Sequence, residues 1–264
     1  MGQALYFIAM VFLFAHQDDE VFILPRIQYE LSVNSDINFF YLTSGGARRC
    51  RESTNLLLSI GVKKENIHFI GDNAEIPDGQ LIDNLNQAYR LLISYPVITE
   101  STTLIVPAWE GGHHDHDACA ILANAIRKII PEKRMTVLQF FLYNGQGLRW
   151  KLFKVMSPLS ESQAALQFRS ISLRSGIVAL MALRYFPSQL STWIGLAPGL
   201  FFQFILKRVE VLAQLNSETT ECRPHFGPLL YERYGRSTYE KVSSRRLSFI
   251  KQIDSELQAF VGDD

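Results

Sequence analysis

The chain has 264 residues, of which 47% are hydrophobic and 20% are charged, and this composition is typical of a folded globular protein. Lysine plus arginine and aspartate plus glutamate each number 26, so the formal net charge is zero. A nucleic-acid-binding protein needs excess basic residues to neutralise phosphates, so we expect no nucleic acid partner. Three widely spaced cysteines without a CxxC pair are not a disulfide framework, and they fit a reducing, cytoplasmic compartment.

An apolar run opens the chain from Ala4 to Ala15. No lysine or arginine precedes this run and no small-residue cleavage site follows it, which argues against a signal peptide. The run is also too short to span a bilayer. A buried strand of a parallel sheet explains it, because such strands read as continuous apolar segments.

The first half of the chain alternates strand-like and helix-like segments. This alternation predicts an α/β fold with a Rossmann-like, mostly parallel sheet and helices on both faces. Ligands bind beyond the carboxyl ends of the strands in such folds, so we expect reactive side chains there. Strands are expected at 4–15, 38–43, 66–70, 103–108 and 135–142, and helices at 28–33, 50–60, 81–94 and 117–130.

The second half is a run of helix-like segments instead. We therefore divide the chain into an α/β core, 1–150, and a helical C-terminal region, 151–264, which completes the domain and its pocket. Within this region the stretch 185–206 carries no charge and is long enough to cross a membrane. Pro187, Pro198 and several polar residues interrupt it, so we expect two short apolar helices broken near Pro198. They would pack on the core or on another subunit, or lie at a membrane surface; a true span is least favoured, and the oligomeric state stays open.

The first cluster of chemically reactive residues, AHQDDE at 15–20, directly follows the first predicted strand. Three consecutive carboxylates beside His16 repel one another and resist burial unless a cation compensates them. Taken alone, this motif is equally well explained as a solvated acidic turn.

The second cluster, WEGGHHDHD at 109–117, follows the predicted strand 103–108 and holds three histidines within four residues. Imidazole and carboxylate are the groups that zinc and similar divalent metals prefer. Gly111 and Gly112 allow the backbone to turn sharply and to approach a ligand closely. A lone histidine cluster is often a surface coincidence, but two clusters at equivalent strand ends indicate a metal site.

The pairing of AHQDDE at 15–20 with GGHHDHDA at 111–118 resembles the LmbE-like, or PIG-L, family of zinc-dependent N-acetylglucosaminyl deacetylases. The resemblance covers about residues 4–145 and is weaker beyond them. The remaining matching segments are LTSGG at 42–46, Arg-x-x-Glu at Arg49–Glu52, SIGV at 59–62 and, similar to the tail of some bacterial members, RPHFGPLLYER at 223–233.

The resemblance implies that His16, Asp19 and His116 are the metal ligands. Two histidines and one carboxylate leave a coordination position open, as in a catalytic rather than a structural zinc site. Zinc is the expected cofactor, although Fe²⁺ or Co²⁺ also suits such ligands.

The resemblance also assigns roles around the metal. Asp18 matches the general base, and His113 matches the acid or electrostatic partner of the tetrahedral intermediate. Asp115 is placed to orient or charge-tune His113. Arg49 matches a substrate-site arginine, and His225 is a further candidate for the pocket rim, against the alternative of a surface histidine in a turn.

The chain departs from the family pattern at two kinds of position. Gln17 and His114 replace the usual prolines of the two motifs, and His114 is either a spectator or a competitor for the metal. The segment 21–25 replaces a small glycine-rich segment, which would reshape the substrate pocket.

These features predict a zinc-dependent hydrolase that removes an N-acetyl or other N-acyl group from an amino sugar or its glycoconjugate, free or lipid-linked. One alternative is a hydrolase of another small amide, such as a thiol-cofactor precursor. Another is a peripheral membrane protein with a structural metal site. A structural site normally uses four protein ligands, so three ligands with a spare carboxylate and histidine favour catalysis. The sequence does not specify the sugar, the acyl group or the native metal.

Overall fold

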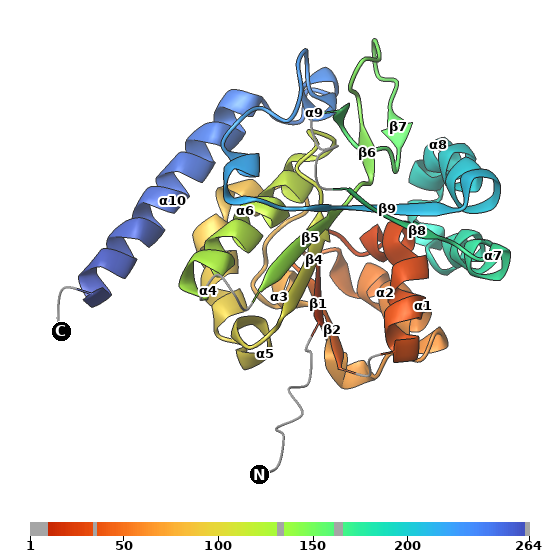
Figure 1. Ribbon diagram of the computed structural model, residues 1–264, viewed down its shortest axis with the longest axis horizontal. Helices are drawn as coiled ribbons and strands as arrows, with labels where there is room; N and C mark the ends of the chain where they lie inside the picture. Colours follow the sequence, from red (N-terminus) through yellow and green to blue (C-terminus); the bar gives the residue numbers. More distant parts are fainter. Residues whose placement is uncertain (1–9, 34–35, 131–134, 161–165, 262–264) are drawn as a thin grey trace.

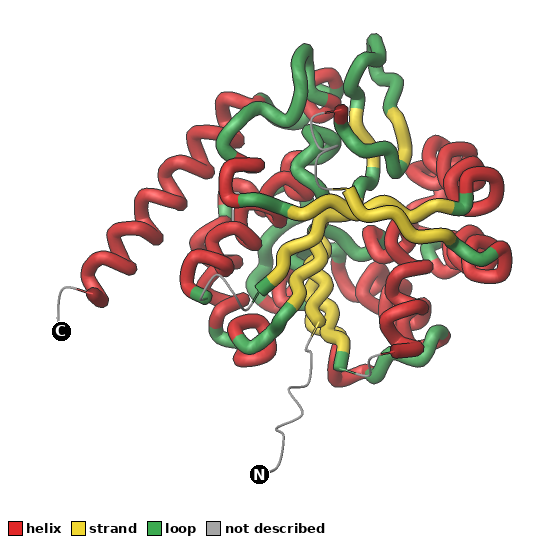
Figure 2. The backbone as a smooth tube through the Cα atoms, viewed as in Figure 1, coloured by secondary structure: helices red, strands yellow, loops and turns green. Residues whose placement is uncertain are grey.

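A single seven-stranded sheet organises the protein in a computed structural model that describes residues 10–33, 36–130, 135–160 and 166–261 (Figures 1 and 2). The strand order is β3-β2-β1-β4-β5-β9-β8. The first five strands run parallel, and the last two join antiparallel. The predicted strand residues 4–9 lie outside the described part. The strands of this sheet are β1 (Met10–Phe14), β2 (Ile37–Tyr41), β3 (Ile67–His68), β4 (Thr103–Pro107), β5 (Thr136–Phe140), β8 (Leu166–Ser170) and β9 (Val209–Gln214).

Helices cover both faces of the sheet, which confirms the predicted fold class (Figure 1). Helices α1, α2, α7 and α8 pack on one face, and α4, α6 and α10 pack on the other. A small hairpin of β6 (Tyr143–Asn144) and β7 (Lys154–Val155) stands apart from the sheet. The helices are α1 (Leu24–Val33), α2 (Gly46–Ser59), α3 (Ile70–Asn73), α4 (Leu85–Ile93), α5 (Pro96–Thr99), α6 (His114–Ile129), α7 (Leu173–Met181), α8 (Leu190–Phe201), α9 (Leu230–Arg233) and α10 (Tyr239–Val261).

The central strand β1 is buried on both faces along its whole length. Phe12 and Phe14 belong to the apolar cluster on the α1 side, whereas Val11 and Leu13 belong to the cluster on the α6 side. Because successive side chains of a strand point to opposite faces, only a continuous apolar run can fill both clusters. The apolar opening of the chain is therefore explained by its place in the sheet.

The second half of the chain contributes two strands that the sequence did not predict. Strand β9 pairs with β5, with Gln139 opposite Ala213, and β8 pairs with β9, with Phe168 opposite Val211. Both strands lie at the end of the sheet and are only partly buried, so they lack the continuous apolar run that marks the central strands. The sheet thus crosses residue 150, and the division of the chain at that residue remains a prediction.

The predicted break of the apolar stretch 185–206 near Pro198 is wrong. Helix α8 continues through Pro198 into a π-helical segment, Phe202–Lys207. Proline removes one backbone hydrogen bond from a helix, but packing of the buried face on the core keeps this helix continuous. Within the described residues, Pro187–Lys207 is the one helix of sufficient length and hydropathy to cross a membrane, with 21 residues and a mean hydropathy of 1.3.

Replacing Phe14 with alanine tests the account of the core. Phe14 is fully buried, and its ring packs against Phe39, Tyr41 and Phe140. The cavity left by Phe14→Ala should lower the free energy of unfolding by about 3–5 kcal/mol, measured by urea denaturation. The control Leu247→Ala, at an exposed site on α10, should change it by no more than about 0.5 kcal/mol. Equal effects of the two substitutions would contradict this packing.

Candidate metal centre and active site

The two sequence motifs meet at one edge of the sheet. Strands β1 and β4 are parallel neighbours, with Phe12 opposite Ile105, so the residues after both strands emerge side by side. The first motif enters a 3₁₀ turn, Asp19–Ile23, and the second leads into α6. As a result, His16 and His116 lie in contact although 100 residues separate them in the chain.

The three predicted metal ligands form a compact, buried group. One ligand atom from each of His16, Asp19 and His116 lies within 4.8 Å of the others. Nδ1 of His16 is 3.3 Å from Nε2 of His116, which in turn is 3.1 Å from Oδ1 of Asp19. Two imidazoles and one carboxylate that converge in this way suit a divalent metal such as zinc. The geometry fits the ion, and the assignment of these residues as ligands remains a prediction.

The surroundings shift the pKa values of the three consecutive carboxylates in different directions. Burial raises the pKa of Asp18 to about 8 against the opposing charge of Arg49, and burial raises the pKa of Glu20 to about 7. Burial also opposes ionisation of Asp19, but the neighbouring His116 and His16 outweigh it and hold the pKa of Asp19 well below its usual range. Consecutive carboxylates in such surroundings are ones that a bound cation would stabilise.

Asp115 contacts a predicted metal ligand, His16, through its carboxylate and the ring of His113 through its backbone N–H. Its carboxylate accepts hydrogen bonds from the backbone N–H groups of Gly79, at 2.7 Å, and Leu81, at 3.0 Å. The same carboxylate lies 3.1 Å from Nε2 of His16. A carboxylate behind a ligand histidine fixes its tautomer and the direction of its ring. The carboxylate of Asp115 thus orients His16, while its charge also opposes the lowering of the pKa of His113, and the predicted role of Asp115 toward His113 stays a prediction.

His113 is held as a neutral donor. It caps the start of α6, and its Nδ1 accepts the backbone N–H of Asp115 at 3.2 Å. With Nδ1 used as an acceptor, the hydrogen-bond network assigns the ring proton to Nε2. Burial and the adjacent charge of His16 lower the pKa of His113 well below its ordinary value. The surroundings of His113 therefore disfavour its protonated form and favour a neutral ring that donates a hydrogen bond from Nε2.

His114 anchors a loop instead of joining the metal-binding groups. Its Nε2 lies 2.8 Å from the carbonyl oxygen of Gly79, and its ring stacks on that of His113. Among the described residues it belongs to neither set of side chains that are arranged to hold a metal. This placement favours the spectator role over competition for the ion.

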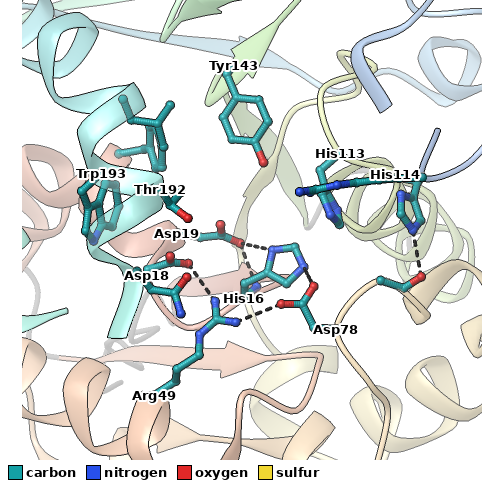
Figure 3. A pocket seen from close by; sticks show the side chains of 15 residues that line it. His16, Asp18, Asp19, Arg49, Asp78, His113, His114, Tyr143, Thr192 and Trp193 are labelled. Atoms are coloured by element: carbon teal, nitrogen blue, oxygen red, sulfur yellow. Dashed lines mark hydrogen bonds and ion pairs between the residues drawn. The ribbon is translucent and has the colours of Figure 1, made fainter. Parts of the chain in front are cut away.

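Arg49 links the acidic run to an aspartate that the sequence did not single out (Figure 3). Its Nη2 lies 3.3 Å from Oδ1 of Asp18, and its Nη1 lies 2.9 Å from Oδ2 of Asp78. Asp18 itself has a φ of 132°, a conformation that costs free energy for a residue with a Cβ and is often found at functional sites. Arg49 therefore restrains the carboxylate that is predicted to be the general base.

Asp78 also reaches the metal cluster. Its Oδ1 lies 3.2 Å from Nε2 of His16, and it forms a second metal-capable group with His16 and His113. Although burial opposes it, the charge of His16 and the hydrogen bonds from His16 and Arg49 lower the pKa of Asp78. The available signal in the sequence was the turn Pro77-Asp78-Gly79 soon after a short parallel strand.

A buried carboxylate behind the site positions Tyr143. Glu110 accepts the backbone N–H groups of Leu142, at 2.7 Å, and Tyr143, at 3.0 Å, and the side-chain amide of Asn144, at 3.1 Å. Gly112 makes room for this segment, since a Cβ there would lie 2.0 Å from the carbonyl oxygen of Tyr143. The centre of the Tyr143 ring consequently lies 5.5 Å from the centre of the His116 ring. Sequence reasoning missed Tyr143, although it follows a predicted strand.

Gln17, at one of the positions where the family has proline, ties two strand ends together. Its side-chain amide donates to the carbonyl oxygen of Thr43 at 2.8 Å, and its own carbonyl oxygen accepts from Arg49. The segment 21–25 that replaces the glycine-rich stretch places Phe22 in the wall of the cavity. These departures therefore change the frame and the wall of the pocket and leave the predicted ligands in place.

A cavity of about 440 Å³ opens over the cluster, and the C-terminal half of the chain supplies one wall (Figure 3). An adjoining, more apolar cavity of about 280 Å³ shares four of its lining residues. The residues common to both cavities are Tyr143, Thr192, Leu196 and Arg236.

His225 is buried but lines neither cavity. Its Nδ1 lies 2.8 Å from the carbonyl oxygen of Phe226, so the ring is engaged within its own loop. The structure therefore gives no support for the predicted place of His225 at the pocket rim. Arg236, which sequence reasoning did not identify, lies there instead.

Comparison with known proteins shows a shared fold without close sequence similarity. No family model matches the chain, and no curated protein matches its sequence. The teicoplanin biosynthetic deacetylase is 12% identical with a TM-score of 0.56, over 78% of this chain and 97% of that one. The A40926 pseudoaglycone deacetylase is also 12% identical with a TM-score of 0.56, over 79% and 97%. The N,N'-diacetylchitobiose deacetylase from Pyrococcus horikoshii is 15% identical with a TM-score of 0.51, over 83% and 88%. This chain therefore has the Rossmann-like α/β fold of these deacetylases.

Metal binding tests the cluster directly. Zinc-reconstituted protein should retain about one equivalent of zinc after dialysis, and His116→Ala should retain almost none, because three protein ligands are the usual minimum for a catalytic site. Metal content is measured by atomic emission. His68→Ala is the control, because His68 lies in β3 and outside the cavity. Full retention of zinc by His116→Ala would exclude His116 as a ligand.

The contact between Asp115 and His16 gives a second prediction. Asp115→Asn should weaken zinc affinity by roughly 10–100-fold, because the ring of His16 loses the carboxylate that orients it. Competition with a chromophoric chelator measures this affinity. If affinity were unchanged while activity fell, Asp115 would act on His113, as the resemblance implied.

Proposed function

We propose that this protein is a zinc-dependent hydrolase that removes an N-acetyl or other N-acyl group from an amino sugar or its glycoconjugate. The observation that carries the proposal is the convergence of His16, Asp19 and His116 beside Asp18, at the base of an open cavity. The shared fold with solved deacetylases supports it, and one of these is named for N,N'-diacetylchitobiose, an acetylated amino sugar.

His16, Asp19 and His116 would hold the metal. When bound there, zinc would lower the pKa of a coordinated water to about 7 and polarise the carbonyl of an amide. Fe²⁺ and Co²⁺ favour similar ligands, so the choice of zinc as the native metal is itself part of the proposal.

Asp18 would serve as the proton carrier. Its carboxylate lines the cavity next to the cluster and is restrained by Arg49. It would accept a proton from the attacking water and then pass this proton to the amine nitrogen as the amide bond breaks. A positioned acid or base of this kind contributes a factor of about 10² to 10⁴ in rate.

His113 would stabilise the oxyanion of the tetrahedral intermediate. Because its Nδ1 accepts a backbone hydrogen bond, its Nε2–H remains as the donor. A preorganised neutral donor stabilises developing negative charge without giving up its proton. His113 thus takes the electrostatic role, and proton delivery falls to Asp18. The hydroxyl of Tyr143 points into the same cavity and offers a second donor (Figure 3).

Arg49, Asp78 and Arg236 would bind the polar part of the substrate. All three line the cavity and present charged groups that hydrogen-bond to sugar hydroxyls. A small free amino sugar and a lipid-linked amino sugar both fit this proposal. Another small amide would use the same chemistry with a different wall of the cavity. A purely structural metal site is less favoured, because three protein ligands beside an open cavity leave a position for a reactant.

Acetate release tests the function. Zinc-loaded protein should release acetate from at least one of N-acetylglucosamine, N,N'-diacetylchitobiose and nucleotide- or lipid-linked N-acetylglucosamine. Asp18→Asn should lower kcat by about 10² to 10⁴-fold while zinc stays bound, because it removes only the base.

The control Asp83→Asn replaces an aspartate paired with Lys241 and Arg245 outside the cavity, and it should keep full activity. Full activity of the Asp18→Asn variant would show that Asp18 is not the general base. No acetate from any substrate, with one equivalent of zinc bound, would favour another amide or a non-catalytic metal.

A further inference from the structure

Helices α7 and α8, with the π-helical segment that follows, form a helical platform, residues 173–207, at one end of the molecule (Figure 1). Helix α7 packs tightly on the π-helical segment, since a Cβ at Gly176 would lie 2.3 Å from the carbonyl oxygen of Phe204. The inner face of the platform joins the apolar core through Trp193, Leu196 and Leu200. The platform is therefore a fixed part of the fold.

The outer face of the platform is apolar. On α7 the exposed residues recur every fourth position, and on α8 and the π-helical segment they continue along the side away from the core. Ile194 is 71% exposed. Single exposed apolar residues are normal, but a continuous stripe of them marks an interaction surface. The exposed apolar residues of the platform are Leu173, Ile177, Met181, Leu190, Ile194, Phe201, Phe202 and Leu206.

The charged residues of the platform segment itself are all positive. No aspartate or glutamate occurs between Glu161 and Glu210, in a chain whose formal net charge is zero. Four basic side chains of this segment are exposed, namely Arg174, Arg184, Lys207 and Arg208. An apolar stripe bordered by lysine and arginine is the composition of helices that lie in the interface of anionic bilayers.

The platform is built to lie on a bilayer and not to cross it. Pro187–Lys207 is long enough to span a membrane, but its inner face is committed to the core. The Trp193 ring packs with Phe22 and Phe186. A transmembrane position would strip this face from the core and leave the apolar core surface that it covers exposed to water, which costs about 25 cal/mol for each Å² of that surface.

We propose that the α7–α8 platform docks this protein on the surface of a bilayer that contains anionic lipid. The apolar stripe enters the interface, and the basic side chains contact the lipid headgroups. Thr192, Trp193 and Leu196 of the same helix line the candidate active-site cavity. The docking helix is thus the one whose inner face forms a wall of the candidate active-site cavity. The proposal does not depend on which reaction the site catalyses.

Vesicle co-sedimentation of the full chain tests the docking. Wild type should bind vesicles of phosphatidylcholine with phosphatidylglycerol, and binding to phosphatidylcholine alone should be much weaker. The double variant Ile194→Ser/Phe202→Ser should lose at least about ten-fold in vesicle affinity, because two large apolar groups no longer enter the interface. Arg174→Gln and Lys207→Gln should each weaken binding to anionic vesicles by roughly five-fold.

The matched control is Phe226→Ser/Leu247→Ser, which removes one exposed aromatic and one exposed aliphatic side chain outside the platform and should bind like wild type. Far-UV circular dichroism and retained zinc show that each variant is folded. Absence of wild-type binding to anionic vesicles, or equal binding by the platform variant and the control, would overturn the proposal. So would a wild-type dimer, detected by light scattering, that the platform variant converts to monomer without any vesicle binding, because the stripe would then be an interface between copies.

Discussion

The parallel pairing of β1 with β4 is the constraint on which the candidate site depends. The two strands lie side by side in the buried centre of the sheet, so the residues that follow them must emerge at the same edge. His16 and Asp19 come from one strand end and His116 from the other. Neither segment alone supplies enough ligands to hold a catalytic metal. The fold therefore creates the site by joining two short pieces of sequence.

The same pairing forces charged groups into a buried environment. Asp18, Asp19 and Glu20 are all buried at the end of an apolar strand, an arrangement that is costly without compensation. Compensation comes from His16 and His116 on one side and from Arg49 on the other. A divalent cation would add to it, so metal binding should stabilise the fold as well as support chemistry.

Much of this arrangement could be predicted from sequence where the signals are local. Apolar runs that end in reactive residues predicted the parallel strands. They also indicated that both motifs lie at one edge of the sheet. The partner of Asp115, the contact of Asp78 with His16 and the place of Tyr143 depend on how loops fold back, and periodicity carries no such information. Strands β8 and β9 were missed because they are partly exposed and lack a continuous apolar run. The helix through Pro198 was missed because packing outweighed a local helix breaker.

Titration of zinc into metal-free protein, with acetate release followed at each step, tests the central claim most directly. The account predicts that activity on an N-acetylated amino sugar rises in proportion to added zinc and reaches its maximum near one equivalent, since one cluster of three predicted ligands would hold the ion. Full activity in the absence of metal would contradict the account. So would the absence of activity on every N-acyl amino sugar tested while zinc is bound at this cluster.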